Sequence, residues 1–316
     1  MILALVEVAA RITEPYLPEP DRWPSSEAAA KVDQMEDLED DPNPISTVFL
    51  GSSVVAEGID PVAFSESAGT TGYNAALSAA SPRSLVPWTQ NVVLSTAEPR
   101  LAVIGLVSRD LNDNGISQTE FVERLESSPG MIERGQPDNL METLEKWFLA
   151  HSALFRVRPF LGDPERLLSE LFPAGGAEGD EVEAVGALGA DSSYDGQPYA
   201  DIDTWRAAWN ARHLNDFLIG ESEIEALHEL IERLKSSGVQ VMLVNMPVTD
   251  DYVDTIRDGA RLQVEFSDLL EDTASDLEVG YLDVSDQFDK EAFRDPAHLT
   301  PAGARSLAIA LAEASS

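Results

Sequence analysis

One serine in this chain follows a short apolar run in a setting that could support nucleophilic catalysis. In the stretch "STVFLGSSVVAEGID" the apolar run ends at Gly51, and Ser52 and Ser53 follow directly. A serine hydroxyl is a weak nucleophile until a base takes its proton, and Ser53 alone also fits a tight strand-to-helix turn. The rest of the chain must therefore supply a base, a group that orients the base, and donors for a developing oxyanion.

A histidine and an aspartate stand three residues apart near the C-terminus, in "FRDPAHLTPAGA". The spacing predicts a loop that carries Asp295 and His298 just before a helix capped by Thr300. His298 could take the Ser53 proton while Asp295 holds the imidazole and stabilises its cation. The alternative is structural, with His298 in a surface loop and Asp295 forming a turn before a proline.

The composition restricts the other kinds of function. The chain has 316 residues, of which 43% are hydrophobic, as in an ordinary globular protein. Its 57 acidic and 21 basic residues give a net charge of −36, which disfavours nucleic acid as a partner. There are no cysteines, so disulfides, thiol catalysis and zinc–thiolate sites are excluded. No dinucleotide or phosphate-binding motif occurs, and neither a metal nor an organic cofactor is expected.

Only four histidines are available for acid–base chemistry: His151, His213, His228 and His298. The first three lie in predicted helices, where packing or surface roles are the commoner ones. His213 is at helical spacing from Trp205 and Trp209. These two tryptophans and Trp147 could shape a carbohydrate groove, although tryptophans in helices are more often part of a core.

The elements that would position these residues alternate between strands and helices. The apolar strand candidates are Thr47–Leu50, Gly72–Leu77, Leu101–Val107, Val239–Asn245 and Gly280–Val284. Short continuous apolar strands between helices predict a three-layer α/β/α sandwich with a central parallel sheet. The carboxyl ends of such strands share one edge, so Ser53 and His298 can meet there.

The remaining segments suggest how the chain is divided. Residues 1–44 read as an N-terminal helix followed by a Pro- and acid-rich solvated linker, and residues 45–316 as the α/β/α domain. A helical insertion is predicted at about 110–235. Within it, 174–198 is rich in Gly, Ala and acidic residues, and we expect a mobile surface segment or a lid.

The first and last motifs resemble those of a known family. "FLGSSVVAEGID" and "DPAHLTPAG" are similar to the first and last blocks of the SGNH (GDSL-like) hydrolases, over roughly 45–315 apart from the insertion. "LIERLKSSGVQVMLVNMPVTDDY" resembles the cell-envelope branch, which includes alginate O-acetylation factors and the D-alanyl transfer protein of teichoic-acid synthesis. The resemblance implies Ser53 as nucleophile, His298 as base and Asp295 as its partner.

The departures from the family pattern concern the neighbours of the nucleophile. Ser52 replaces the family's aspartate, and Ala79 stands where a glycine N–H usually serves the oxyanion hole. The third block, usually Gly-x-Asn-Asp, has no clean match in "GLVSRDLND". Arg109 and Asn112 are the candidates to replace its asparagine donor. Loss of one oxyanion donor typically costs about 10²- to 10³-fold in rate.

Two functions follow as expectations. The first is a serine esterase or O-acyltransferase acting on an acyl group, most simply acetyl, of a cell-envelope or exported carbohydrate. The second is a non-catalytic envelope protein that binds polysaccharide or assembly partners. The N-terminal apolar stretch, about a dozen residues against the ~20 needed to span a bilayer, reads either as the end of a membrane anchor or as an ordinary helix of a cytoplasmic esterase.

Overall fold

A parallel sheet forms the centre of the protein, as the strand candidates predicted. The computed structural model describes residues 2–17, 21–39, 42–137, 140–158, 199–214 and 217–315. The strands are β1 (Thr47–Leu50), β2 (Gly72–Asn74), β3 (Leu101–Leu106), β4 (Gln240–Asn245) and β5 (Gly280–Asp283). All neighbouring pairs are parallel, and the strand order is β2-β1-β3-β4-β5. This order is that of a doubly wound, flavodoxin-like sheet.

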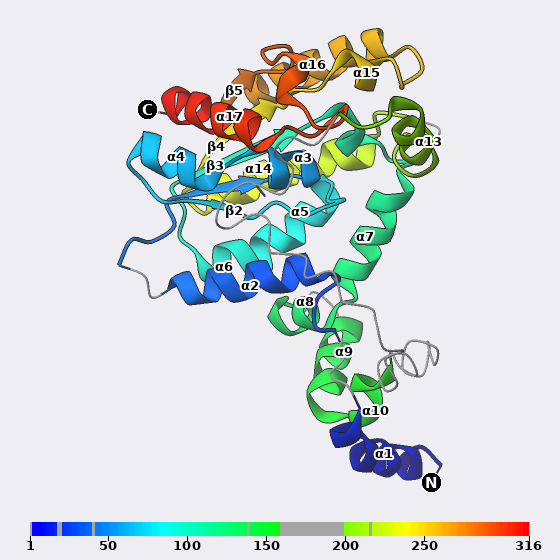
Figure 1. Cartoon of the computed structure of the whole chain (residues 1–316). Coiled ribbons are helices and arrows are strands. Elements are labelled where there is room, and N and C mark those ends of the chain that lie inside the picture. Colours follow the sequence, from blue (N-terminus) through cyan, green and yellow to red (C-terminus); the bar gives the residue numbers. More distant parts are fainter. Residues whose placement is uncertain are drawn as a thin grey trace.

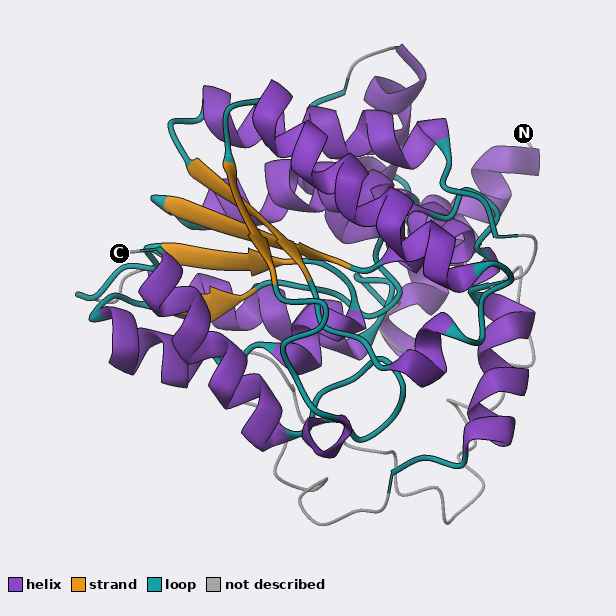
Figure 2. Cartoon of the chain, turned by 90° about the horizontal axis from the view of Figure 1, so that it is seen from above, coloured by secondary structure: helices purple, strands orange, loops and turns teal. Residues whose placement is uncertain are grey.

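Helices cover both faces of this sheet, which confirms the three-layer prediction (Figure 2). One core contains α2 (Ser26–Glu39), α5 (Pro82–Trp88) and α14 (Glu221–Ser236). The other core contains α4 (Pro61–Ala68) and α17 (Pro301–Ala314). Because both faces are covered, all four residues of β1 are buried, which explains the apolar run that follows Thr47.

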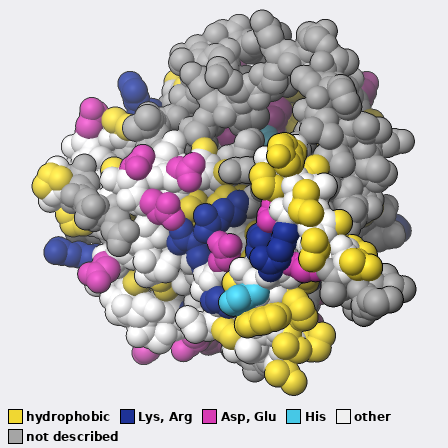
Figure 3. Space-filling model, turned by 90° about the horizontal axis from the view of Figure 1, so that it is seen from below, with side chains coloured by type: hydrophobic (Ala, Val, Ile, Leu, Met, Phe, Trp, Pro, Cys, Tyr) yellow, Lys and Arg dark blue, Asp and Glu magenta, His cyan; other side chains and the backbone are white. Residues whose placement is uncertain are grey.

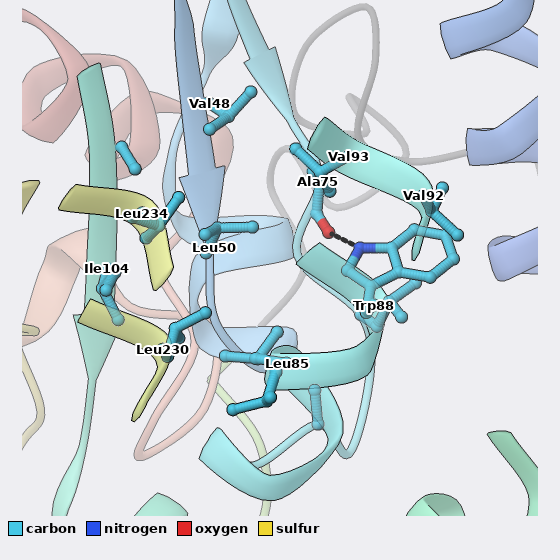
Figure 4. Close-up of a cluster of buried hydrophobic side chains, with 14 of the residues drawn as sticks. Val48, Leu50, Ala75, Leu85, Trp88, Val92, Val93, Ile104, Leu230 and Leu234 are labelled. Atoms are coloured by element: carbon cyan, nitrogen blue, oxygen red, sulfur yellow. Dashed lines mark hydrogen bonds between the residues drawn. The ribbon is translucent and has the colours of Figure 1, made fainter. Parts of the chain in front are cut away.

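Trp88 packs in the core that contains α2, α5 and α14, beside the end of β2 (Figure 4). Its side chain is fully buried, and its Nε1 donates a hydrogen bond to the carbonyl oxygen of Ala75 at 2.9 Å. Trp23 packs edge-on against it, with ring centroids 6.1 Å apart. Trp88 therefore ties α5 to the strand end that leads toward the candidate site.

Replacing Trp88 by phenylalanine is expected to lower the free energy of unfolding by about 1–3 kcal/mol. The variant leaves the buried Ala75 carbonyl without its donor and opens a small cavity. Urea denaturation of both proteins measures the difference. Trp147→Phe is the matched control: its side chain is 52% exposed, so we expect less than about 0.5 kcal/mol. Equal losses in the two variants would contradict the assignment.

Helix α2 corrects the prediction of a solvated linker before residue 44. Its apolar stripe lies in the core and consists of Ala28, Val32 and Met35. Lys31 is fully buried on the same helix, and its Nζ donates to the carbonyl oxygen of Asn74 at 2.9 Å. The linker prediction was wrong for α2 because the many acidic residues hide an apolar stripe at helical spacing.

The chain between β3 and β4 forms further helices, some of them away from the sheet (Figure 1). In order they are α7 (Ile116–Glu126), α8 (Pro129–Arg134), α9 (Leu140–His151), α10 (Ala153–Arg156) and α13 (Ile202–Arg212). Helix α14 follows them and packs against α5 and β4. The segment 174–198, predicted as a mobile insertion or lid, lies outside the described residues.

The N-terminal helix α1 (Ile2–Thr13) packs against α10, far from the sheet (Figure 1). Seen from this lower side, the molecule presents apolar and basic side chains beside one another (Figure 3). The exposed apolar residues of α1 include Leu5, Val8 and Ile12. Within the described ranges, no helix combines the length and the apolar character needed to cross a membrane.

Candidate active site

Ser53 lies at the carboxyl end of β1, on the first turn of α3 (Ser53–Gly58). The turn between strand and helix needs Gly51, because a Cβ there would lie 2.6 Å from the carbonyl oxygen of Gly105 on β3. The N–H groups of a first helical turn have no partner within the helix. The turn therefore presents the Ser53 hydroxyl at the sheet edge, beside the backbone N–H groups that begin the helix.

The three residues singled out as a catalytic set are in hydrogen-bond contact. Ser53 Oγ lies 3.0 Å from His298 Nε2. His298 Nδ1 lies 2.8 Å from Oδ2 and 3.0 Å from Oδ1 of Asp295. A carboxylate only accepts, so the proton on Nδ1 points to Asp295 and leaves Nε2 free to accept from the serine hydroxyl. The arrangement is that of a nucleophile, a base and a group that orients the base.

A closed loop holds the acid and the base in this geometry. Phe293 pairs with Leu299 across the loop, and Arg294 N–H donates to the carbonyl oxygen of His298 at 3.0 Å. Thr300 then caps α17 by accepting a hydrogen bond from the backbone N–H of Gly303, as the sequence predicted. The loop is thus fixed at both ends before the final helix begins.

Asp295 is built to remain ionised. Burial alone would raise its pKa, but the His298 ring and the N–H groups of Ala297 and His298 outweigh burial and hold the pKa below its ordinary value. Both N–H groups donate to Oδ1, at 2.9 and 3.0 Å. The carboxylate is therefore available to hold the imidazole through the neutral and mildly acidic range.

This lowered pKa predicts a pH-dependent contribution to stability. A carboxyl group with a depressed folded-state pKa stabilises the fold above its unfolded pKa, about 3.9, and loses that contribution as the pH falls through the folded value. Wild type should therefore unfold with a larger free energy than Asp295→Asn at pH 5, and the gap should narrow below about pH 4. Denaturant titrations at each pH measure the gap. A gap that stays constant down to pH 3 would contradict the assignment.

Of the two candidates for the third block, only Arg109 reaches the serine. It follows β3 in the short helix η3 (Ser108–Leu111), is 1% exposed, and donates from Nη2 to Ser53 Oγ at 3.0 Å. The Nδ2 of Asn112 instead donates to the carbonyl oxygen of His213 at 2.8 Å. Asn112 is therefore engaged with the end of α13, and no contact described for it reaches Ser53; its role as an oxyanion donor stays a prediction.

Ala79 lies in the turn after β2, next to the turn that carries Gly51 and Ser53. The N–H of Leu77 donates to the carbonyl oxygen of Gly51 at 3.1 Å, which joins the two turns. Ala79 has φ 63°, in the left-handed region that glycine adopts most easily. This backbone shape suits a position where the resemblance expects glycine. Its role as an oxyanion donor stays a prediction.

Asp110, for which the sequence predicts no role in the site, lies beside the buried charge of Arg109. One carboxylate oxygen lies 3.6 Å from Arg109 Nε without forming a hydrogen bond. The other accepts from Ser52 Oγ at 3.2 Å and from Val107 N–H at 3.0 Å. Burial raises the pKa of Asp110, and the Arg109 charge opposes that rise. In the sequence, the feature that could have indicated this buried pair is an arginine directly followed by an aspartate, just after the predicted strand Leu101–Val107.

Helix α13 adds two side chains whose role in the site the sequence reading missed. Trp209 lies under the Arg109 guanidinium, 4.5 Å from Cζ to the ring centroid, and its ring is 5.8 Å from that of His298. His213 Nδ1 lies 3.4 Å from Arg109 Nη1. Of the other tryptophans, Trp205 is 8% exposed and belongs to the core, while Trp147 is in α9, outside this site.

A separate cavity of about 600 Å³ lies between α5, α8, α9 and α14. Charged residues such as Arg83, Glu142 and Lys146 line it, but the serine, histidine and aspartate do not. It lacks any comparable nucleophile and base pair among its lining residues. The chemistry of the side chains therefore points to Ser53 and not to this cavity.

Comparisons with known proteins find only solved structures of low sequence identity. No family model matches the chain, and neither does any curated protein. The acetyl xylan esterase AlAXEase has 13% identity and a TM-score of 0.41, covering 85% of this chain and 99% of that one. Est24, a carbohydrate acetylesterase from Sinorhizobium meliloti, has 11% identity and a TM-score of 0.41, covering 85% and 97%.

A GDSL-like lipase from Bacteroides thetaiotaomicron has 10% identity and a TM-score of 0.37, covering 98% of each chain. Identities and TM-scores this low carry no argument about the activity, which rests on the geometry of the site itself. At these low identities, the chain is similar to solved structures described as an acetyl xylan esterase, a carbohydrate acetylesterase and a GDSL-like lipase.

Proposed function

We propose that this protein is a serine esterase or O-acyltransferase that uses Ser53, His298 and Asp295 on an ester-linked acyl group. One observation carries the proposal: Ser53 Oγ is 3.0 Å from His298 Nε2, and His298 Nδ1 is 2.8 Å from Asp295. The same imidazole thus touches the nucleophile on one side and a carboxylate on the other. Acyl transfer through serine needs this arrangement.

In the first step Ser53 Oγ forms a bond to the ester carbonyl carbon while its proton moves to His298 Nε2. The carbonyl electron pair moves onto oxygen, where the N–H groups of Ser53 and Ala79 would stabilise the charge, helped by the Arg109 guanidinium. His298 then returns the proton to the departing alcohol oxygen as the bond from carbon to that oxygen breaks. The product is an acyl group on Ser53.

The second step decides between the two activities. Water attacking the acyl-enzyme, with His298 as base, makes the protein an esterase. A carbohydrate hydroxyl in the same position makes it an O-acyltransferase. We propose acetyl as the acyl group and a cell-envelope or exported carbohydrate as its carrier, following the resemblance of the stretch "LIERLKSSGVQVMLVNMPVTDDY" to the cell-envelope branch.

Hydrolysis of a short series of aryl esters tests the reaction and the acyl length together. We expect turnover of the acetyl ester to exceed that of the octanoyl ester, and acetylated sugars to be hydrolysed or to donate acetyl to a second sugar. Product analysis by mass spectrometry separates hydrolysis from transfer. No turnover of any ester by a folded protein would contradict the enzyme proposal.

The alternative is a non-catalytic protein of the same fold that binds polysaccharide or assembly partners. The missing asparagine donor of the third block favours it. Arg109 supplies a charged donor to Ser53 in that region, which favours the enzyme. Polysaccharide binding without acyl loss would support the alternative.

An envelope location is part of the proposal and rests on the surface of α1. Leu5, Val8 and Ile12 are each more than half exposed on this helix. Such a face could lie against a lipid surface. Co-sedimentation with neutral lipid vesicles is expected, and a triple Leu5, Val8 and Ile12 replacement by serine should abolish it. A protein that stays unbound would favour the cytoplasmic alternative.

A further inference from the structure

We propose that Trp209 of α13 and His213, the residue that caps the C-terminal end of this helix, form a positioning pair that holds Arg109 and His298 against Ser53. The inference rests on the proposed function and adds two residues to it. Both groups that bond Ser53 Oγ are touched by this one helix. Neither Trp209 nor His213 contacts the serine in the interactions described for it, so their action would pass through Arg109 and His298.

Trp209 lies between the two partners of the nucleophile. The Arg109 guanidinium sits over its ring at 4.5 Å, within the range of a cation–π contact. The edge-to-face contact with the imidazole of His298 has ring centroids 5.8 Å apart and an interplanar angle of 71°. Trp205 stacks on Trp209 from one helical turn earlier, with centroids 4.3 Å apart. The indole is therefore fixed in place while it supports both groups.

His213 acts on the other end of the guanidinium. Its Nδ1 lies 3.4 Å from Arg109 Nη1, while Nη2 of the same group donates to Ser53. Burial, and then the Arg109 charge, lower the pKa of His213 to about 3, so the ring is neutral and its Nδ1 can accept. Acceptance at Nη1 limits rotation of the planar guanidinium and so directs Nη2 to Ser53.

Several contacts hold α13 in this place. Asn112 Nδ2 donates to the carbonyl oxygen of His213 at 2.8 Å. Arg206 Nε donates to Thr255 Oγ1, and Arg212 Nε donates to Ser117 Oγ, each at 3.1 Å. The helix is thus tied to the loop after β3 and to the chain after β4. Through its hydrogen bond to the His213 carbonyl oxygen, Asn112 helps to hold α13 in place, whereas the sequence predicted it as a candidate oxyanion donor.

The test compares the pair with a matched pair elsewhere in the chain. Trp147 and His151 have the same spacing in α9, with stacked rings 4.9 Å apart, but lie away from the site. Trp209→Leu and His213→Leu should slow fluorophosphonate labelling of Ser53 and lower kcat by about 10- to 100-fold. KM and the thermal midpoint should change little. Trp147→Leu and His151→Leu should label at the wild-type rate.

Conservative variants separate positioning from simple packing. Asparagine can place an acceptor near the position of Nδ1, and phenylalanine keeps an aromatic face. His213→Asn and Trp209→Phe should therefore recover labelling to within about threefold of wild type. The ¹⁵N spectrum of His213 should show a neutral ring protonated at Nε2 from pH 5 to 8.

The possible results distinguish a failure of the positioning role from a failure of the proposed enzymatic function. A wild-type protein whose Ser53 is not labelled would overturn the proposed function and this inference with it. Rapid wild-type labelling with equally rapid labelling of Trp209→Leu and His213→Leu would overturn only the positioning role. Folded leucine variants that stay slow, together with asparagine and phenylalanine variants equally slow, would also overturn it.

Discussion

Replacement of Ser53 by alanine should remove esterase activity almost completely, by roughly 10⁴- to 10⁶-fold in kcat. The acyl-enzyme needs an oxygen at this position, and Ser53 Oγ is the atom within 3.0 Å of the His298 base. His298→Ala should give a loss of the same order, because the serine then has no proton acceptor. Residues that act as one unit lose activity non-additively, so the double variant should be no slower than either single variant. Initial rates on an aryl acetate measure all three.

Ser236→Ala is the matched control for this loss. Ser236 is exposed near the end of α14, where its hydroxyl bonds only the helix backbone among the contacts described for it. It should keep wild-type activity. Thermal unfolding of Ser53→Ala should stay within about 1 kcal/mol of wild type, since most of the site remains. Substantial turnover by Ser53→Ala would show that another group is the nucleophile.

Arg109→Met is expected to have the second largest effect, and on two properties at once. Loss of the donor 3.0 Å from Ser53 Oγ should cut the rate about 10²- to 10³-fold. The change also leaves Asp110, 1% exposed, without its counter-charge. Removing one partner of a buried pair typically costs about 3–5 kcal/mol of stability. Esterase rates and urea denaturation measure the two effects separately.

The double variant Arg109→Met/Asp110→Asn separates catalysis from folding. Neutralising both charges should return much of the lost stability, because no isolated charge stays buried. The rate should remain low, since the donor to Ser53 is still missing. A double variant that recovers activity along with stability would show that Arg109 serves the fold and not the reaction.

The sheet and the contact between Ser53 and His298 could be predicted from the sequence because their signals are local. Strand β3 is a continuous apolar run, and β1 ends where Gly51 and two serines begin. Asp295 and His298 share one loop before a capped helix, so their contact needs only the chain reversal between them. Parallel strands then bring Ser53 to the same edge.

The other features of the fold and the site could not be predicted, because they depend on contacts between segments that are distant in the sequence. Arg109 and Asn112 could not be distinguished as donors from the sequence. The difference arises at the end of α13, where the carbonyl oxygen of His213 accepts a hydrogen bond from the Asn112 amide. The acidic composition of α2 concealed a stripe that packs into the core. Trp209 and His213 read as packing residues, since nothing local indicates that a buried arginine meets them 100 or more residues away in sequence.

The most direct test of the central claim is labelling with a fluorophosphonate probe followed by peptide mass spectrometry. The probe reacts with an activated serine and not with ordinary hydroxyl groups, so it reports on the nucleophile without knowledge of the substrate. We expect one adduct, on Ser53, that is absent in Ser53→Ala and in His298→Ala. A folded wild-type protein that takes no probe, or takes it elsewhere, would contradict the account and leave Gly51–Ser53 as a structural turn.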